Sequence, residues 1–307
     1  MSNLILPVPF AESVYGQHCK PNHSRIIDVA GANDNQAAAM PVNLLRANCT
    51  VLAPLEYNSY PDKLEDPISY LDSNVDMAQK LQARIASQFD WDNDKLCVIG
   101  GDHSVSAGTG AGLSKLTDMT KIGLIWVDGH SDFNTHLTTP SRSMTGCPCA
   151  INFGLGMRQF TDLYQGNFIQ KIVQIGLREV DYRESQNLQN AKIKTYSVLD
   201  IEELGMARIM SEILDYLSDL DYIWLSIDID SLDSSYFEKT ETDDPLMGGL
   251  TPRELLYITN KVQTTNKLKV FELMQLNELN KTTQLTVLAS RLIEMSFGLG
   301  KFRYNQT

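Results

Sequence analysis

Short apolar runs recur along the chain, and most are rich in Val, Ile or Leu and apolar on both faces. Such runs are typical of strands buried inside a parallel sheet. The run Leu4–Val8 predicts a first strand. Further strands are predicted at Lys95–Ile99, Ile122–Val127, Ile172–Ile175, Ile193–Tyr196, Tyr222–Ile227 and Leu268–Glu272.

Helical patterns lie between these runs, at Asn74–Phe89, Met206–Leu217, Pro252–Val262 and Thr282–Phe297. The third has a start signal, since Thr251 can cap it and Glu254 follows three residues later. This alternation predicts an α/β protein with one domain over residues 1–307. Its sheet is expected to be doubly wound and mostly parallel, with helices on both faces. Residues 16–48 carry little pattern and are expected to form irregular surface chain.

Composition narrows the class of protein. The 307 residues are 43% apolar and 21% charged, which is ordinary for a globular protein. No apolar run approaches the length of about 18 residues that spans a bilayer. The net charge of −12 argues against nucleic acid or an acidic membrane as a partner. Five cysteines without a CxxC pair fit a reducing compartment, so we expect a cytoplasmic protein, with Cys97 in the core.

Three polar clusters follow predicted strands, at the end where open α/β sheets bind ligands. The first follows two glycines at the end of the strand over 95–99, and the third follows the strand over 222–227. In the second, acidic and imidazole side chains alternate, so an extended backbone would point them to one side. Together the clusters offer six candidate metal ligands: His103, Asp128, His130, Asp132, Asp228 and Asp230.

A metal centre explains these residue types better than a solvated surface does. Buried carboxylates without partners repel one another and resist burial. Four carboxylates nearly cancel the charge of two divalent cations, which can hold a bridging hydroxide. Ligands rich in oxygen and without thiolate favour Mn²⁺ over Zn²⁺. Taken singly, His103 also fits a loop histidine, and Asp228 with Asp230 fits a turn-capping pair.

The three motifs resemble those of the arginase (ureohydrolase) superfamily, and arginases most closely. They read GGDHS from Gly100, DGHSDFN from Asp128 and SIDIDSLD from Ser226, and the likeness extends over residues 95–300. The resemblance implies a three-layer α/β/α fold, two Mn²⁺ ions per subunit and a homo-oligomer, either a trimer or a hexamer. It implies one ion on His103, Asp128, Asp132 and Asp228, and a second on Asp128, His130, Asp228 and Asp230.

The same resemblance suggests how a substrate is held. Glu272 matches the carboxylate that receives a guanidinium, which suits a cation with several N–H donors. Asp181 matches the acid that receives an amino group. Asn134, Ser141 and Ser143 match positions beside a substrate carboxylate. Glu272 also fits a strand-end salt bridge, Asp181 a loop acid, and Asn134 and Ser141 turn residues.

Several positions depart from the arginase pattern. Thr145 stands where arginases carry a proton-shuttling His, and Ser143 where they carry an Asn. Arg142 adds a cation beside them. Further departures are Ser234, Gln275 and Asp243-Asp244-Pro245. Without the shuttle, Asp132, solvent at Thr145 or the nearby His136 is left to pass a proton. The metal centre is therefore predicted intact, with an altered substrate rim.

The sequence therefore predicts an enzyme, an amidinohydrolase in which a metal-bridging hydroxide attacks a guanidino carbon. L-arginine, giving urea and L-ornithine, is the favoured small-molecule substrate. Formimidoylglutamase is the second reading, because Arg142 could pair with an extra carboxylate, and agmatinase is the third. A zinc deacetylase of related fold normally needs one metal, which the second ligand set argues against. Outside enzymes, a catalytically silent homologue with a binding or assembly role remains open.

Overall fold

One parallel sheet organises the computed structural model, which describes residues 2–15, 49–236, 247–276 and 283–299. Its eight strands lie in the order β2-β1-β3-β8-β7-β4-β5-β6, and every neighbouring pair is parallel. In chain order the strands are β1 (Ser2–Val8), β2 (Cys49–Val51), β3 (Asp94–Gly100), β4 (Ile122–Val127), β5 (Lys171–Leu177), β6 (Lys194–Ser197), β7 (Tyr222–Asp228) and β8 (Leu268–Met274).

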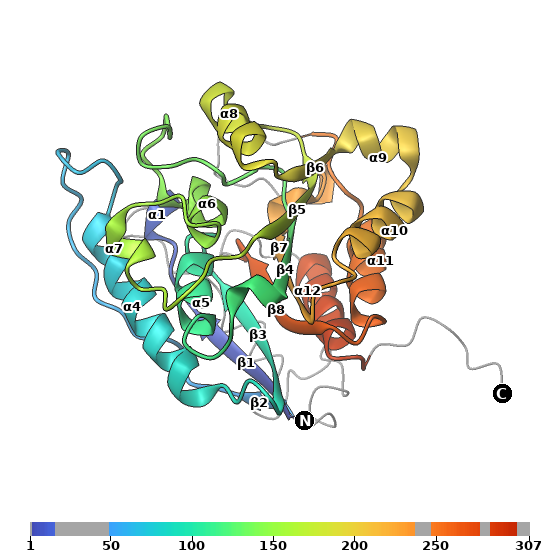
Figure 1. Ribbon diagram of the computed structural model, residues 1–307, viewed down its shortest axis with the longest axis horizontal. Coiled ribbons are helices and arrows are strands. Elements are labelled where there is room, and N and C mark those ends of the chain that lie inside the picture. Colours follow the sequence, from blue (N-terminus) through green and yellow to red (C-terminus); the bar gives the residue numbers. More distant parts are fainter. Residues whose placement is uncertain (1, 16–48, 237–246, 277–282, 300–307) are drawn as a thin grey trace.

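Helices cover both faces of the sheet (Figure 1). One face carries α4 (Leu71–Gln88), α5 (Val105–Leu113), α6 (Pro148–Asn152) and α7 (Arg158–Thr161). The opposite face carries α9 (Val198–Leu204), α10 (Met206–Tyr216), α11 (Pro252–Gln263) and α12 (Thr283–Ser296). The short helix α1 (Glu12–Tyr15) follows β1, and α8 (Tyr182–Ala191) follows β5.

Alternating strand residues build two separate cores. On β7, Trp224 packs into the core beneath α4, whereas Leu225 and Ile227 pack into the core beneath α10–α12. Because both faces are buried, the strands are apolar throughout, as the sequence pattern indicated. The predicted doubly wound α/β sheet is confirmed, and each predicted strand and helix is found with its ends within three residues of the predicted ones.

Several elements were not predicted: the edge strand β2 and the helices α1, α5, α6, α7, α8 and α9. All nine residues of α5 are buried, and three of them are glycines. A Cβ on Gly112 would lie 2.8 Å from Ile85 Cβ of α4, so the glycines let the two helices approach closely. Helix α11 begins as predicted, because the Thr251 side chain accepts a hydrogen bond from Glu254 N at 3.3 Å.

The structure also bears on the predictions for Cys97 and for membrane-spanning segments. Cys97 is fully buried, as predicted. Within the described part of the chain, no helix combines the length and the apolar character needed to cross a bilayer. The predictions for residues 16–48 and for Asp243-Asp244-Pro245 fall outside the described residues.

Candidate metal centre and substrate rim

Sheet order brings the three polar clusters together. Strands β3, β8, β7 and β4 are consecutive neighbours in the middle of the sheet. His103 follows β3, Asp128 follows β4, and Asp228 ends β7. Since all four strands are parallel, their carboxyl ends lie at one edge of the sheet, where α/β proteins bind ligands.

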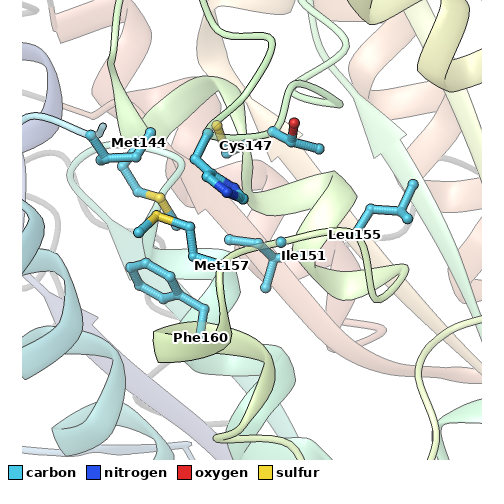
Figure 2. Close-up of a pocket in the computed structure, with 10 residues that line it drawn as sticks. Met144, Cys147, Ile151, Leu155, Met157 and Phe160 are labelled. Carbon is cyan, nitrogen blue, oxygen red and sulfur yellow. The ribbon is translucent and has the colours of Figure 1, made fainter. Parts of the chain in front are cut away.

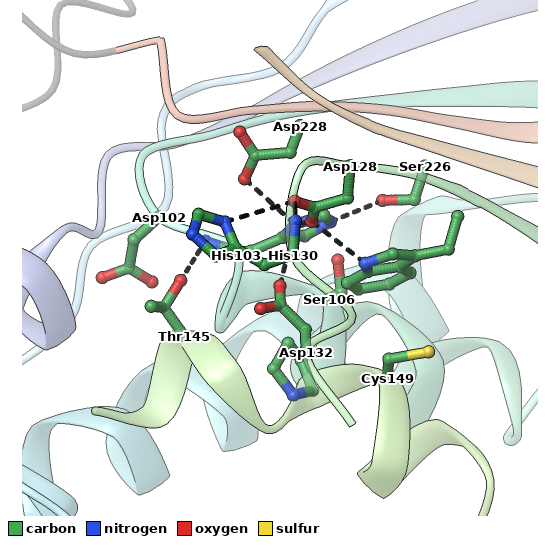
Figure 3. Close-up of polar contacts among 12 residues, drawn as sticks. Asp102, His103, Ser106, Asp128, His130, Asp132, Thr145, Cys149, Ser226 and Asp228 are labelled. Atoms are coloured by element: carbon green, nitrogen blue, oxygen red, sulfur yellow. Dashed lines mark hydrogen bonds and ion pairs between the residues drawn. The ribbon is translucent and has the colours of Figure 1, made fainter. Parts of the chain in front are cut away.

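The first group of side chains surrounds one ring nitrogen (Figure 3). His103 Nδ1 lies 2.9 Å from Asp128 Oδ2, 3.1 Å from Asp228 Oδ2 and 3.2 Å from Asp132 Oδ2. The other ring nitrogen, Nε2, lies 2.9 Å from Ser226 Oγ. All four side chains of the group are buried.

Hydrogen bonds alone do not satisfy this arrangement. Nδ1 carries at most one hydrogen, yet three carboxylate oxygens face it. Ser226 Oγ donates to Glu272 Oε2 at 2.9 Å, so it accepts from His103 Nε2 and fixes the hydrogen there. A neutral His103 then points a lone pair from Nδ1 at the carboxylates, which is the orientation of a metal-binding histidine. The donor set therefore fits a cation.

A second group shares Asp128 with the first. His130 Nδ1 lies 3.0 Å from Asp230 Oδ2 and 3.6 Å from Asp128 Oδ1, while Gly129 N donates to Asp230 Oδ1 at 3.2 Å. The ligand atoms of His103, Asp128 and Asp228 lie within 4.8 Å of one another, and so do those of Asp128, His130 and Asp230. The six side chains thus converge, as expected from the sequence. Their role as metal ligands stays a prediction.

The backbone reaches this geometry by a different route from the one predicted. An extended chain was expected to point the Asp128 cluster to one side, but Asp132 has a left-handed φ of 50°. Asp230 lies in the 3₁₀ turn Ile229–Ser231, whose first turn the Asp228 side chain caps. The predicted extended backbone is therefore wrong at Asp132, and a 3₁₀ turn directly after β7 positions Asp230.

Electrostatics reflect an excess of negative charge. Burial and the charge of Asp128 raise the pKa of Asp132 to about 8. Burial, with the charges of Asp230 and Asp128, raises the pKa of Asp228 well above its usual range. Burial alone would lower the pKa of His103, but its carboxylate partners raise it instead. Without a cation, protons bound to Asp132 and Asp228 therefore neutralise part of the negative charge that a cation would otherwise balance.

Two strand residues that the sequence analysis passed over orient the ligands. Trp126 Nε1 donates to Asp128 Oδ2 at 3.0 Å, and the Trp126 ring stacks on His103 with 3.9 Å between centroids. Ser226 holds His103 from the other side. Each lies two residues before a ligand and so on the same face of its strand. A polar Ser226 inside an apolar strand was the available signal.

Arg178 joins the two ligand-bearing loops. Its backbone N donates to Gly129 O at 2.8 Å, in the loop after β4. Its guanidinium donates to Asp230 O at 2.6 Å and to Ser231 O at 2.8 Å, in the turn after β7. Because these carbonyl groups flank the ligands, Arg178 fixes the position of one loop relative to the other.

Glu272 is buried beside the first group. Its Oε2 accepts hydrogen bonds from Ser106 Oγ at 2.6 Å and Ser226 Oγ at 2.9 Å, whereas Oε1 has no hydrogen-bond partner among the described residues. Burial raises the pKa of this carboxyl group. An unpaired, buried carboxylate oxygen is costly unless a donor reaches it. A substrate cation is one such donor.

The rim of the site carries Asn134 and Asp181, which meet. Asn134 Nδ2 donates to Asp181 Oδ2 at 3.0 Å, and Asn134 Oδ1 accepts from Thr138 Oγ1 at 2.9 Å. Asp181 caps α8 in a capping box with Glu184. Glu184 is buried and also accepts from Phe133 N at 2.7 Å, so it ties the Asp132 loop to α8. Sequence reasoning missed Glu184.

The rim residues Thr145, Ser143 and Arg142, which depart from the arginase pattern, form hydrogen bonds within the protein. Thr145 Oγ1 accepts from His103 N at 3.1 Å. Ser143 Oγ donates to Ser13 O at 2.7 Å, and Ser141, which is exposed, accepts from Ser143 N at 3.2 Å. Arg142 donates from Nη2 to carbonyl oxygens in the loop before α4, and these contacts turn it toward the protein itself.

His136 lies in the wall of a separate pocket, lined by apolar side chains that include Met144, Cys147 and Met157 (Figure 2). Its Nδ1 is buried, and no described residue forms a hydrogen bond with it. Among the described residues, none of the six candidate ligands has a recorded hydrogen bond or ion pair with His136. Cys147 and Cys149 are buried, and burial raises the pKa of both thiols. Neither thiol is therefore expected to react as a thiolate.

Comparison with known proteins gives consistent matches. A sequence profile of the arginase family matches residues 21–298. Arginase of Bacillus subtilis (strain 168) is 35% identical over 196 residues, covering 63% of this chain and 63% of that protein. Human arginase-1 is 37% identical over 196 residues, covering 61% of this chain and 60% of the human protein. The chain thus spans less than two thirds of either relative.

Similarity in three dimensions extends further along the chain. The crystal structure of arginase from Bacillus subtilis subsp. subtilis str. 168 superposes with a TM-score of 0.84 at 26% identity. That superposition covers 99% of this chain and 100% of the other.

Proposed function

Since the chain belongs to the arginase family, we propose that it hydrolyses a guanidino C–N bond. L-arginine or a close analogue is the substrate, and urea and an amine are the products. One observation carries the proposal: three carboxylate oxygens face a single imidazole nitrogen, a donor set that fits a cation. The second group around His130 provides for another cation, with Asp128 common to both.

The six side chains would hold two divalent ions, for which Mn²⁺ is the preferred identity. When bound, such ions would lower the pKa of a coordinated water molecule and stabilise negative charge in the transition state. Trp126 and Ser226 hold His103 and Asp128 in place, so that the ligands are fixed before the metal arrives.

Two carboxylates would orient the substrate: Glu272, beside the first ligand group, and Asp181, at the rim. The unpaired Oε1 of Glu272 accepts N–H groups of the guanidinium, and the pairing removes an unsatisfied buried acceptor. Asp181, at the rim, receives the amino group at the far end of the substrate. Asp132, which lies in the first ligand group, would pass a proton from the attacking water to the leaving amine. Solvent at Thr145 is an alternative donor.

A substrate panel tests the proposal. The full chain, stripped of metal and reconstituted with Mn²⁺, is assayed for urea release from L-arginine and for formamide release from formimidoylglutamate. Turnover of formimidoylglutamate alone would contradict the choice of substrate. Two metals bound without turnover of any amidino compound would support a silent homologue. The Arg142 contacts described above give no support to formimidoylglutamase, since its Nε and Nη2 already donate to carbonyl groups of the protein.

Location and assembly are also proposed from the sequence and the family. We expect a cytoplasmic homo-oligomer that contacts neither nucleic acid nor membrane. Measurement of mass in solution, by light scattering, tests the oligomeric part of this expectation.

A further inference from the structure

The side chains nearest to an expected substrate carboxylate are occupied by the N-terminal part of the chain. Ser143 gives its hydroxyl hydrogen to Ser13 O at 2.7 Å. Arg142 Nη2 donates to Asp66 O at 2.7 Å and to Lys63 O at 3.0 Å. A serine whose only hydrogen is engaged cannot also donate to a carboxylate. The Ser143 hydroxyl is therefore withdrawn from substrate recognition, and the Nε and Nη2 groups of Arg142 face the segment before α4.

This arrangement is fixed by several contacts. Arg142 has a left-handed φ of 58°, and its carbonyl oxygen accepts from Ser69 N at 2.8 Å. Arg142 Nε donates to Asp66 O at 3.2 Å as well. The segment before α4 and the rim segment thus hold one another through both backbone and side chain. Release of the guanidinium toward a substrate would leave the half-buried carbonyl group of Asp66 without its side-chain donors.

Few donors remain for a substrate carboxylate at the predicted positions. Asn134 spends one amide hydrogen on Asp181 and has a second to offer. Its amide lies beside the negative charge of Asp181, which opposes a second anion there. The exposed Ser141 has a hydroxyl within 3.3 Å of Thr139 Oγ1. Asn134 and Ser141 are both neutral.

The amino end of a substrate has a better partner. Asp181 is exposed at the start of α8, and its side chain is aligned by Asn134 Nδ2. Its carboxylate also accepts from the α8 backbone in the capping box, and its oxygens keep lone pairs for an ammonium group. Arg183, another cation of the rim, is exposed and reaches Leu137 O at 3.5 Å, so water screens its charge. The rim therefore favours an amine over a carboxylate.

We propose that the enzyme recognises guanidino substrates through their amino end and gains little from an α-carboxylate. Its substrate class is linear guanidino amines, with or without the carboxylate. The inference rests on the proposed function and makes it more specific. It also explains why Arg142 and Ser143 can depart from the family pattern: here they secure the rim, and the substrate does not need them.

Three guanidino compounds test this on the Mn²⁺-reconstituted full chain, with urea as the readout: L-arginine, agmatine and desamino-arginine. Agmatine keeps the amine and lacks the carboxylate, and desamino-arginine has the opposite pattern. We expect kcat/KM for agmatine to lie within about a hundredfold of that for arginine, since sites built around a polar group discriminate by far more. Desamino-arginine should be the poorest of the three.

Two variants separate the rim residues. Ser143→Ala should leave the ratio of kcat/KM between arginine and agmatine within about threefold, because its hydroxyl serves Ser13. Asp181→Asn should lower kcat/KM for both compounds by similar factors of about tenfold or more. A fall in the ratio for Ser143→Ala would show that this hydroxyl meets the carboxylate, and would overturn the inference.

The substrate assays distinguish failure of this inference from failure of the proposed function. A preference for arginine over agmatine above about a hundredfold, or better turnover of desamino-arginine than of agmatine, would overturn the inference and leave the proposed function intact. Urea from none of the three compounds would refute the proposed function and the inference together.

Discussion

The candidate metal centre and the substrate rim are positioned by different parts of the fold. The centre takes its side chains from the ends of neighbouring central strands, and most of these side chains are buried. The rim consists of the segment 134–147 and the start of α8, and hydrogen bonds hold it to Ser13 and to the segment before α4. Sheet order places the first region, whereas individual hydrogen bonds between distant segments place the second.

This difference explains which region departs from the family pattern. Moving a ligand of the centre would require a shift of a buried strand, which close packing resists. A rim residue can exchange its partner for a nearby carbonyl group, as Ser143 and Arg142 do. Substrate selectivity can therefore change while the metal centre persists. Changes in the two regions should have separable effects on metal binding and on selectivity.

The largest effect is expected for Asp128→Asn, because Asp128 belongs to both ligand groups. The amide keeps the shape but removes a negative charge that two cations would share. The loss of several kcal/mol of transition-state stabilisation corresponds to a fall in kcat of about a thousandfold or more. Urea release and bound metal per chain are measured together. Near-normal activity of this variant would remove the shared ligand from the mechanism.

Stability without metal should depend on pH in a defined direction. Asp132 has a pKa of about 8 in the folded protein, against roughly 4 in an unfolded chain, and the pKa of Asp228 is raised as well. Between these values the folded state binds more protons. The free energy of unfolding of EDTA-treated protein should therefore fall as pH rises from about 4 to 8, by roughly 1 kcal/mol per pH unit.

Two controls sharpen this test, which uses urea denaturation at several pH values. Asp132→Asn should flatten the dependence, since it removes a carboxyl with a raised pKa. Addition of Mn²⁺ should reverse the trend, because the ligands must lose their protons to bind metal. A metal-free protein that becomes more stable as pH rises through this range would contradict the crowding of carboxylates.

The contrast between the regions also marks what the sequence could predict. Strand identity and the ligand positions followed from apolar runs that end in Asp or His, because a parallel sheet places such ends together. Trp126 and Ser226 were within reach of the same reasoning, since each lies two residues before a ligand on the same face of its strand. The sheet half of the site was thus predictable from local pattern.

The rest depended on partners far away in the chain. Helix α5 has three glycines, and only its packing against α4 explains why they are tolerated. Nothing near Arg142 in the sequence indicates that its guanidinium bonds to carbonyl groups nearly 80 residues earlier. The left-handed backbone at Asp132 was equally hidden, because an acidic residue there fits an extended chain as well.

A smaller effect is expected when the link between the ligand loops is cut. Arg178→Met keeps the side-chain length and removes the hydrogen bonds to Asp230 O and Ser231 O. The loss of such indirect support for metal ligands typically costs ten- to a hundredfold in metal affinity, and we expect a fall in that range for Mn²⁺. Titration of urea-releasing activity with Mn²⁺ measures it. Arg208→Met, which removes an exposed pair with Glu212, is the matched control and should change nothing.

The smallest effect should come from the rim, in Arg142→Met. The variant removes the hydrogen bonds to Lys63 O and Asp66 O, and a net contribution near 1 kcal/mol for each typical bond predicts a loss of about 1–2 kcal/mol in stability. Urea denaturation measures the loss. Arg84→Met is the control, since Arg84 makes only long contacts of 3.4 Å and 3.5 Å. Because the rim is held independently of the metal centre, Mn²⁺ affinity should stay within about threefold of that of the unmodified chain. A loss of Mn²⁺ affinity as large as that expected for Arg178→Met would show instead that the two regions are one coupled unit.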